Sequence, residues 1–169
     1  TWNVLTSTQP TGASGSQFKY VQKIVVNSSG VIFVATDTGI MRSLDGGLTW
    51  LRIFNTRSAD VELASNDDLY VGTFTGAVQR SINPTVTTPT FTAITPTTGG
   101  SRVEIAIAAS ESSTTATTTL YAIAGNGQNI AWFKKSTNGG TSWTDAPYQD
   151  TENKIAALEQ HTLHADSRG

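Results

Sequence analysis

The chain has 169 residues, enough for one domain with a hydrophobic core, and 37% of them are hydrophobic. Charged residues make up only 14% and the formal net charge is −2, so the sequence shows no electrostatic footprint for nucleic acid. It has no cysteine, which excludes disulfides and thiolate metal sites, and no apolar run near the roughly 18 residues of a transmembrane helix. We therefore expect no nucleic-acid partner, no transmembrane segment and no cofactor.

Short runs of β-branched and alternating residues predict strands along most of the chain. Strands that open a unit are expected at 21–26, 61–63 and 103–108. The strand pair that follows repeats between units: 33–39 aligns with 70–76, and a third copy begins at Leu120 and reaches Ser136. Each unit therefore contains four short strands joined by turns, which predicts a four-stranded antiparallel sheet. The approximate units are 21–53, 60–94 and 102–146.

One eight-residue turn pattern occurs twice, as SLDGGLTW at 43–50 and as STNGGTSW at 136–143. The paired glycines supply backbone angles with φ > 0, and the Asp or Asn before them can accept hydrogen bonds from backbone N–H groups of the turn. The closing tryptophan begins the next strand with a large apolar ring. We interpret these as structural residues of a hairpin turn: Ser43, Asp45, Gly47, Thr49 and Trp50 in the first copy, and Ser136, Asn138, Gly140, Ser142 and Trp143 in the second.

The middle unit and the chain ends depart from this pattern. After Ser81 the sequence has two prolines before Phe91 takes the tryptophan's place, which predicts a looser loop and the loss of the turn. Residues 1–5 resemble 49–53, so they are expected to be the tail of a preceding unit. Residues 161–169 are expected to start a following unit.

A stack of three sheets has an open sheet at each end, which invites association. We therefore expect as partners either the remaining units of a longer chain or further copies of this chain. Residues 153–160 fit no unit, because they combine good helix formers with Ile155 and Leu158 three positions apart. They are expected to form either a short surface helix between units or the first strand of the next one.

The two turns and the repeated units resemble the Asp-box, or BNR, repeats of β-propellers. Such propellers occur in sialidases, in xyloglucan-cleaving glycoside hydrolases of family 74, in sortilin-type receptors and in exported bacterial surface proteins. The resemblance implies an all-β fold of propeller blades, with about three blades in this chain and an incomplete ring. It also implies a secreted or cell-surface bacterial protein that acts as a binding or structural module, with a glycan as a candidate ligand. In these families the Asp-boxes lie on the outer rim, so the resemblance does not decide the activity.

Two enzymatic alternatives follow from the same resemblance. Thr36-Asp37-Thr38-Gly39 resembles the context of a catalytic carboxylate in family 74, which makes Asp37 a candidate whose partner carboxylate would lie outside this segment. The other interpretation of Asp37 is an aspartate that caps its own turn before Gly39. A sialidase would need an arginine cluster, but Arg42 and Arg80 occupy equivalent repeat positions, which indicates a structural role. A third possibility is a scaffold that binds other proteins.

The remaining candidates are weaker. Trp132 and Tyr148 could stack on sugar rings, although packing between units accounts for large aromatic residues equally well. His161, His164 and Asp166 form a cluster of metal-ligating types. On an extended strand, however, residues 161 and 164 point to opposite faces, so their nitrogens do not converge on a zinc ion. We interpret these three as polar residues of a strand and expect no metal.

Overall fold

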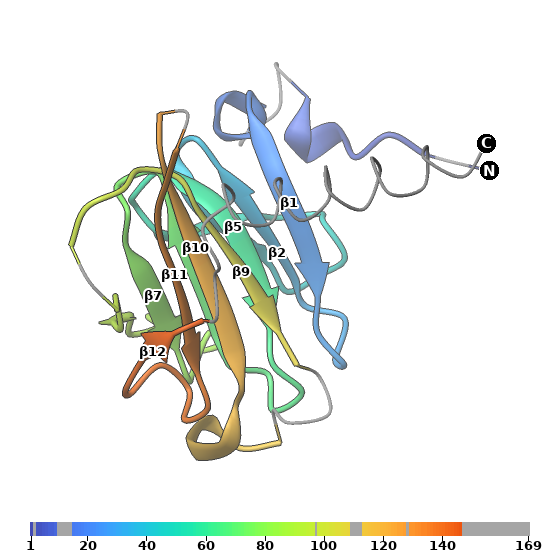
Figure 1. The fold of residues 1–169 in the computed structure, drawn as a ribbon. Coiled ribbons are helices and arrows are strands. Elements are labelled where there is room, and N and C mark those ends of the chain that lie inside the picture. The colour runs from blue at the N-terminus through green and yellow to red at the C-terminus, as the bar shows by residue number, and fades with distance from the viewer. Residues whose placement is uncertain (2, 10–14, 97, 109–112, 128, 147–169) are drawn as a thin grey trace, which may run out of the picture.

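The structure is a computed structural model that describes the chain except residues 2, 10–14, 97, 109–112, 128 and 147–169. It contains three four-stranded antiparallel sheets, each built from consecutive strands (Figure 1). The first sheet comprises β1 (Val21–Val26), β2 (Ile32–Thr36), β3 (Gly39–Ser43) and β4 (Leu51–Phe54). The second comprises β5 (Ser58–Leu63), β6 (Leu69–Thr73), β7 (Val78–Ser81) and β8 (Thr92–Ala93). The third comprises β9 (Val103–Ile107), β10 (Leu120–Asn126), β11 (Asn129–Ser136) and β12 (Thr144–Asp145).

The all-β prediction and the prediction of three four-stranded antiparallel sheets are confirmed. The helices in the described residues are short 3₁₀ turns at Thr6–Thr8, Gly15–Phe18 and Thr115–Thr117. Within the described residues, no helix is long and apolar enough to cross a membrane. The segment 153–160 and the strand expected at 161–169 lie outside the described residues.

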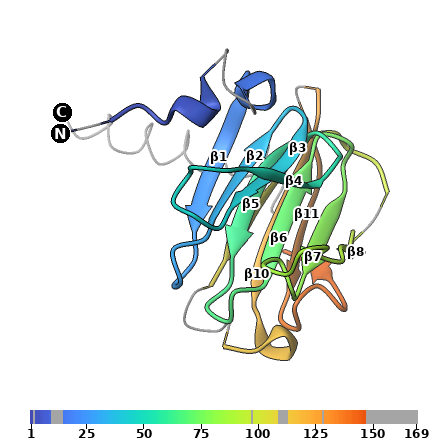
Figure 2. The same cartoon turned by 180° about the vertical axis from the view of Figure 1, so that it is seen from behind.

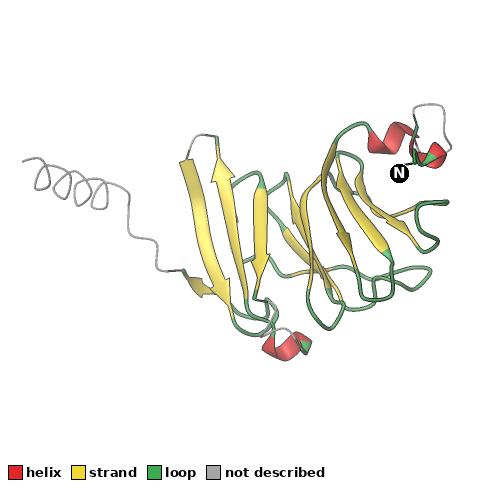
Figure 3. Cartoon of the chain, turned by 90° about the vertical axis from the view of Figure 1, so that its right-hand side faces the viewer, coloured by secondary structure: helices red, strands yellow, loops and turns green. Residues whose placement is uncertain are grey.

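The sheets stack face to face in chain order, with the middle sheet buried on both sides (Figure 3). Seen from behind, β6 and β7 run alongside β10 and β11 of the third sheet (Figure 2). Successive residues of a strand point to opposite faces, so β6 contributes to two cores. Its Leu69 and Val71 face the first sheet, and its Tyr70 faces the third. All five residues of β6 are buried.

Two hydrophobic cores fill the spaces between the sheets. The core between the first and second sheets contains Val31, Phe33, Ala35, Ile40, Val61, Leu69 and Val71. The core between the second and third contains Ala64, Tyr70, Val78, Ile94, Val103, Ile105, Leu120, Ala122, Ala124 and Trp132. Burial of these side chains stabilises the stack, because each removes apolar surface from water.

The sheets approach one another most closely along their opening strands. Strand β5 contacts β1 on one side and β9 on the other, whereas β4, β8 and β12 form no comparably close contacts with one another in the described part of the chain. Strand β5 begins at Ser58, three residues before the predicted start, because Ser58 pairs with Thr73 across a bulge. This early start brings Asp60 into the strand.

Candidate functional site

The turn at residues 43–50 is closed by its own side chains, and we call it the first Asp-box turn after the sequence pattern that it resembles. Asp45 Oδ1 accepts the backbone N–H of Thr49 at 2.9 Å, and Asp45 Oδ2 accepts the Thr49 hydroxyl at 2.6 Å. The Ser43 hydroxyl donates to Asp45 Oδ1 at 2.8 Å and accepts the N–H of Gly47 at 2.8 Å. The predicted hydrogen bonds to the turn backbone are therefore present, and Asp45 is fully engaged within its loop.

The second turn, residues 136–143, repeats this arrangement. Asn138 Oδ1 accepts the N–H of Ser142 at 2.9 Å, and the Ser136 hydroxyl accepts the N–H of Gly140 at 2.9 Å. The Trp143 indole N–H donates to the carbonyl oxygen of Ile94 in the second sheet at 2.7 Å. This tryptophan therefore ties its turn to the neighbouring sheet, which is a structural use of the motif.

The middle unit keeps part of the turn, so the prediction that the pattern is lost there is wrong in one respect. Ser81 Oγ lies 3.1 Å from Asn83 Oδ1, and Asn83 Oδ1 accepts the N–H of Thr90 at 3.1 Å. Asn83 thus takes the role of Asp45, although its partner lies seven residues later instead of four. The following Phe91 packs against Phe54 of the first sheet, with ring centroids 4.7 Å apart. The longer loop conceals this relation in the sequence.

The first turn is expected to weaken in acid, whereas the second is not. Hydrogen bonds from the Thr49 hydroxyl and N–H and from Ser43 lower the pKa of Asp45 from 3.8 to about 2. A depressed folded-state pKa stabilises the fold above the unfolded value, and this contribution disappears as pH falls from about 4 through 2. Carboxyl chemical shifts and thermal melts across this range should show the change. The thermal midpoint of Asp45→Asn should lack this acid-induced decrease, because Asn138 already closes the second turn with a side chain that does not titrate. Identical acid profiles for the two proteins would contradict this account.

Two arginines at equivalent positions connect neighbouring sheets. Arg42 Nη1 donates to the carbonyl oxygens of Pro84 and Val86 in the loop of the second sheet, at 2.8 and 2.5 Å. Arg80 Nη1 donates to the carbonyl oxygen of Gly139 in the Asp-box turn of the third sheet at 2.6 Å. Burial lowers the pKa of Arg42. The structural role predicted for these arginines is confirmed.

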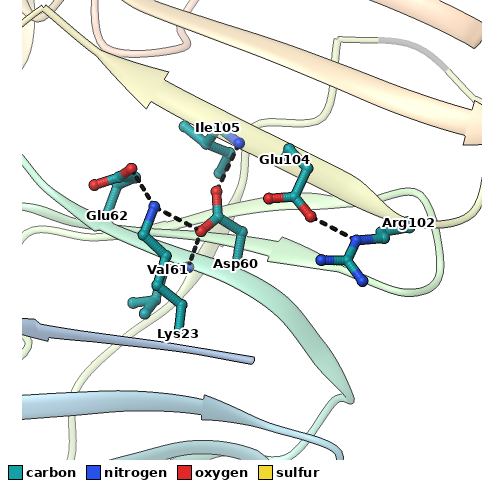
Figure 4. Close-up of polar contacts among 7 residues, drawn as sticks. All are labelled: Lys23, Asp60, Val61, Glu62, Arg102, Glu104 and Ile105. Atoms are coloured by element: carbon teal, nitrogen blue, oxygen red, sulfur yellow. Dashed lines mark hydrogen bonds and ion pairs between the residues drawn. The ribbon is translucent and has the colours of Figure 1, made fainter. Parts of the chain in front are cut away.

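A second group of charges lies along the opening strands, and we call Lys23, Asp60, Glu62, Arg102 and Glu104 the inner charge cluster (Figure 4). Asp60 is its centre and is 1% exposed. Its Oδ1 lies 3.0 Å from Lys23 Nζ on β1 and accepts the N–H of Val61 at 2.9 Å. Its Oδ2 accepts the N–H of Ile105 on β9 at 2.7 Å. One carboxylate therefore joins the opening strands of all three sheets.

The other members of the inner charge cluster are paired and more exposed. Lys23 Nζ also contacts Glu62 Oε1 at 2.5 Å, and Arg102 Nε contacts Glu104 Oε1 at 2.5 Å. Burial by itself lowers the pKa of Lys23, but the hydrogen bonds and negative charges of Glu62 and Asp60 outweigh it and raise the pKa above 10.5. The stabilisation from Lys23 is therefore present at neutral pH and is lost only as pH rises through this raised value.

A third group, which we call the turn cluster, consists of Asp37, Arg57, Phe74 and Arg102. Arg57 and Arg102 each precede an opening strand, and their carbonyl oxygens accept the backbone N–H of Phe74 and Gly125. Arg57 Nε donates to Asp37 Oδ1 at 2.9 Å. The Arg57 guanidinium lies over the Phe74 ring at 3.9 Å from its centroid, and that of Arg102 lies 5.4 Å from the same centroid. Both arginines are about half exposed.

The structure shows a different residue in the turn-capping role that the sequence suggested for Asp37. Its turn is capped by Thr36, whose hydroxyl accepts the N–H of Thr38 at 3.1 Å and donates to the Gly39 carbonyl at 2.9 Å. The turn-capping interpretation of Asp37 is therefore wrong, because the preceding threonine already performs that role. The Asp37 carboxylate instead pairs with Arg57 of the second sheet, at the strand ends opposite the Asp-box turns.

Of the remaining candidate ligand and metal residues, one is buried and the others lie outside the described residues. Trp132 is 7% exposed, packs between the second and third sheets and donates its indole N–H to the Gly99 carbonyl at 2.9 Å. Its burial supports the packing interpretation and leaves no free ring face for a sugar. Tyr148, His161, His164 and Asp166 lie outside the described residues. Among the residues that the structure does describe, no group of three His, Cys, Asp or Glu side chains is arranged to hold a metal ion.

No family model matches the chain, and no curated protein matches it.

The inner charge cluster was not foreseen from the sequence. A usable signal was present, because Asp60 and Glu62 place two carboxylates in one opening strand. Asp60 also falls at the same repeat position as Lys23, since the two residues pair with equivalent positions on the second strand of their sheets.

Proposed function

We propose that the chain forms three consecutive blades of a β-propeller and acts as a carbohydrate-binding module of an exported bacterial surface protein. The framework is supported by three sheets with one strand order, stacked in chain order and closest along β1, β5 and β9. Sheets that converge at their first strands and diverge at their last ones fan around an axis, as propeller blades do. The two complete Asp-box turns follow the third strand of their sheets, as on the outer rim of such a ring.

The turn cluster is the proposed ligand site, and one observation supports it above the others. Two half-exposed guanidinium groups share one phenyl ring, and within the described residues neither donates a hydrogen bond through its terminal nitrogens. Each guanidinium is neutralised by a carboxylate through its Nε, Arg57 by Asp37 and Arg102 by Glu104. Such a surface offers N–H donors and carboxylate acceptors without a net charge, which suits sugar hydroxyls that both accept and donate.

A glycan array with the 169-residue protein and two variants tests this function. Arg57→Gln and Arg102→Gln should each weaken glycan binding about tenfold or more, because one lost charged hydrogen bond corresponds to roughly 1.5–3 kcal/mol. Arg52→Gln is the matched control, since Arg52 is an exposed arginine on β4 that belongs to neither cluster.

The outcomes separate the candidate functions. Binding that the first two variants lose and the control keeps supports the module. Release of reducing sugar from a bound glycan would instead identify a glycoside hydrolase. If no glycan binds at any concentration tested, the carbohydrate proposal is wrong and a protein-binding scaffold becomes the better account.

A further inference from the structure

The two end faces of the stack expose apolar side chains at positions whose equivalents in the neighbouring sheets are buried. On the outer face of the first sheet, Ile24 is 59% exposed. The strand pairing places Ile24 at the position of Val61 and Ile105 in the next two sheets, where exposure is 0% and 5%. Val26, two residues further along β1, is 56% exposed. The outer face of the first sheet therefore has the composition of an interface, but no sheet packs against it within the part of the chain that the structure describes.

The outer face of the third sheet likewise has no sheet packed on it among the described residues. Tyr121 occupies the position at which Phe33 and Tyr70 are fully buried by the next sheet. With Ile123 and Phe133 it lines an apolar hollow of about 290 Å³, bordered by Glu104, Ile105 and Ala106. Inside the stack, a face of this kind meets the opening-strand face of the following sheet.

The contact between Arg80 and the Gly139 carbonyl has an equivalent donor on the third sheet and an equivalent acceptor on the first, and the two lie on opposite end faces of the stack. Lys135 pairs with Tyr121 as Arg80 pairs with Tyr70, so it stands where an arginine reaches the next Asp-box turn. The acceptor used by Arg80 is the carbonyl of Gly139, and the corresponding glycine of the first turn is Gly46. A Cβ on Gly139 would meet Thr115 and Arg80, whereas the space beside Gly46 is open. The third sheet thus supplies a cation, and the first sheet supplies the Gly46 carbonyl, to which no backbone N–H among the described residues donates.

We propose that the outer face of the third sheet binds the outer face of the first sheet of a second copy, so that two copies close a ring of six sheets. The proposal rests on the blade stacking described under the proposed function and does not depend on the ligand. Propellers typically contain four to eight blades, and two sets of the three described sheets make six, which lies within that range. The contact joins two different surfaces, and such a heterologous contact forms a closed assembly when its rotation closes.

The N-terminal segment competes with this contact. Leu5 lies against Gly47 as Ile94 lies against Gly140, and the Ser7 hydroxyl donates to the Gly47 carbonyl at 2.6 Å. Leu5 therefore occupies the place of an outer strand from a preceding sheet, and a docked copy would bring its own β12 there. The segment is lightly packed, with Val4 69% and Leu5 41% exposed. Closure of the ring displaces it, so Leu5→Ser should tighten the association.

Sedimentation equilibrium of the full 169-residue protein tests the proposal. The wild type should sediment at twice 17.9 kDa. Ile24→Lys and Phe133→Lys should each weaken association about 100-fold, because each places a charge in both contacts of the dimer. Ile82→Lys is the control, since Ile82 is 65% exposed on the loop after β7 of the middle sheet, away from both outer faces. Val26→Lys and Ile123→Lys repeat the test if a first variant proves unfolded by circular dichroism.

Sedimentation of a mixture of Ile24→Lys and Phe133→Lys tests whether the contact joins two different faces. Ile24→Lys retains an intact third-sheet face and Phe133→Lys retains an intact first-sheet face. An equimolar mixture can therefore form one unaltered contact, while the second contact carries both lysines and stays open. The mixture should associate more tightly than either variant alone. A wild type that remains monomeric at every concentration overturns the proposal. A mixture that associates no more tightly than the separate variants also overturns it, as does a dimer that one of the two variants keeps at full strength. A wild-type dimer that binds no glycan would count against the ligand proposal alone.

Discussion

Asp60→Ala is expected to destabilise the protein by about 2–3 kcal/mol, the largest effect among its exposed or buried charges. The variant leaves the N–H of Ile105 without its acceptor in a buried position, and an unsatisfied buried donor costs roughly 1–3 kcal/mol. It also removes one of the two carboxylate partners of Lys23, but that lysine is 36% exposed and keeps Glu62, so most of this loss is compensated. Urea denaturation monitored by circular dichroism measures the difference.

Glu62→Gln is the matched control for this experiment. Glu62 contacts the same Lys23 but is 25% exposed and accepts no backbone hydrogen bond across the sheets among the described residues. Its replacement should cost less than about 1 kcal/mol, as for most surface ion pairs. Equal losses for the two variants would show that Asp60 acts only through Lys23. The proposed connection between the second and third sheets would then be wrong.

Gly72→Ala is expected to cost about 1–3 kcal/mol, although alanine usually suits a strand better than glycine. A Cβ at Gly72 would lie 2.3 Å from the carbonyl oxygen of Val103 and 3.0 Å from its carbonyl carbon. Both atoms belong to the backbone of β9, so they cannot move aside as a flexible side chain would. The second and third sheets would have to separate, and the thermal midpoint should fall accordingly.

Gly125→Ala provides the comparison within the chain. Gly125 also lies in a strand, but the nearest atom to its added Cβ is the carbonyl oxygen of Asn129 at 3.9 Å, an ordinary contact. This variant should be neutral or slightly stabilising, because alanine reduces the freedom of the unfolded chain by about 0.4–1 kcal/mol. A Gly72→Ala protein as stable as Gly125→Ala would contradict the close packing of β6 against β9.

Much of the fold could be predicted because its turns and strands are specified by residues that are neighbours in the sequence. The glycine pair beside Asp45 or Asn138 specifies a turn by itself. Short runs of aromatic and β-branched residues along 33–36 and 70–73 specify strands without any knowledge of their neighbours. The middle unit was harder to interpret. Asn83 keeps the hydrogen bond of the turn, but the longer spacing to Thr90 breaks the sequence pattern while the geometry survives.

The candidate site was largely beyond prediction because its contacts join residues that are distant in sequence. Arg57 meets Asp37 and Phe74 only after two sheets have stacked. Nothing adjacent to Asp37 in the sequence indicates that Thr36 will cap the turn and leave the carboxylate for an arginine twenty residues later. The role of Asp60 likewise depends on the N–H of a strand 45 residues away. Stacking, and not local propensity, creates these sites.

A crystal structure of the associated protein tests the central claim most directly. Our account predicts six four-stranded sheets around one axis, with Ile123 of each copy packed on the face that includes Ile24 of the other and with Lys135 directed at the first Asp-box turn. Two third sheets packed face to face, or three sheets that do not stack in chain order, would contradict it.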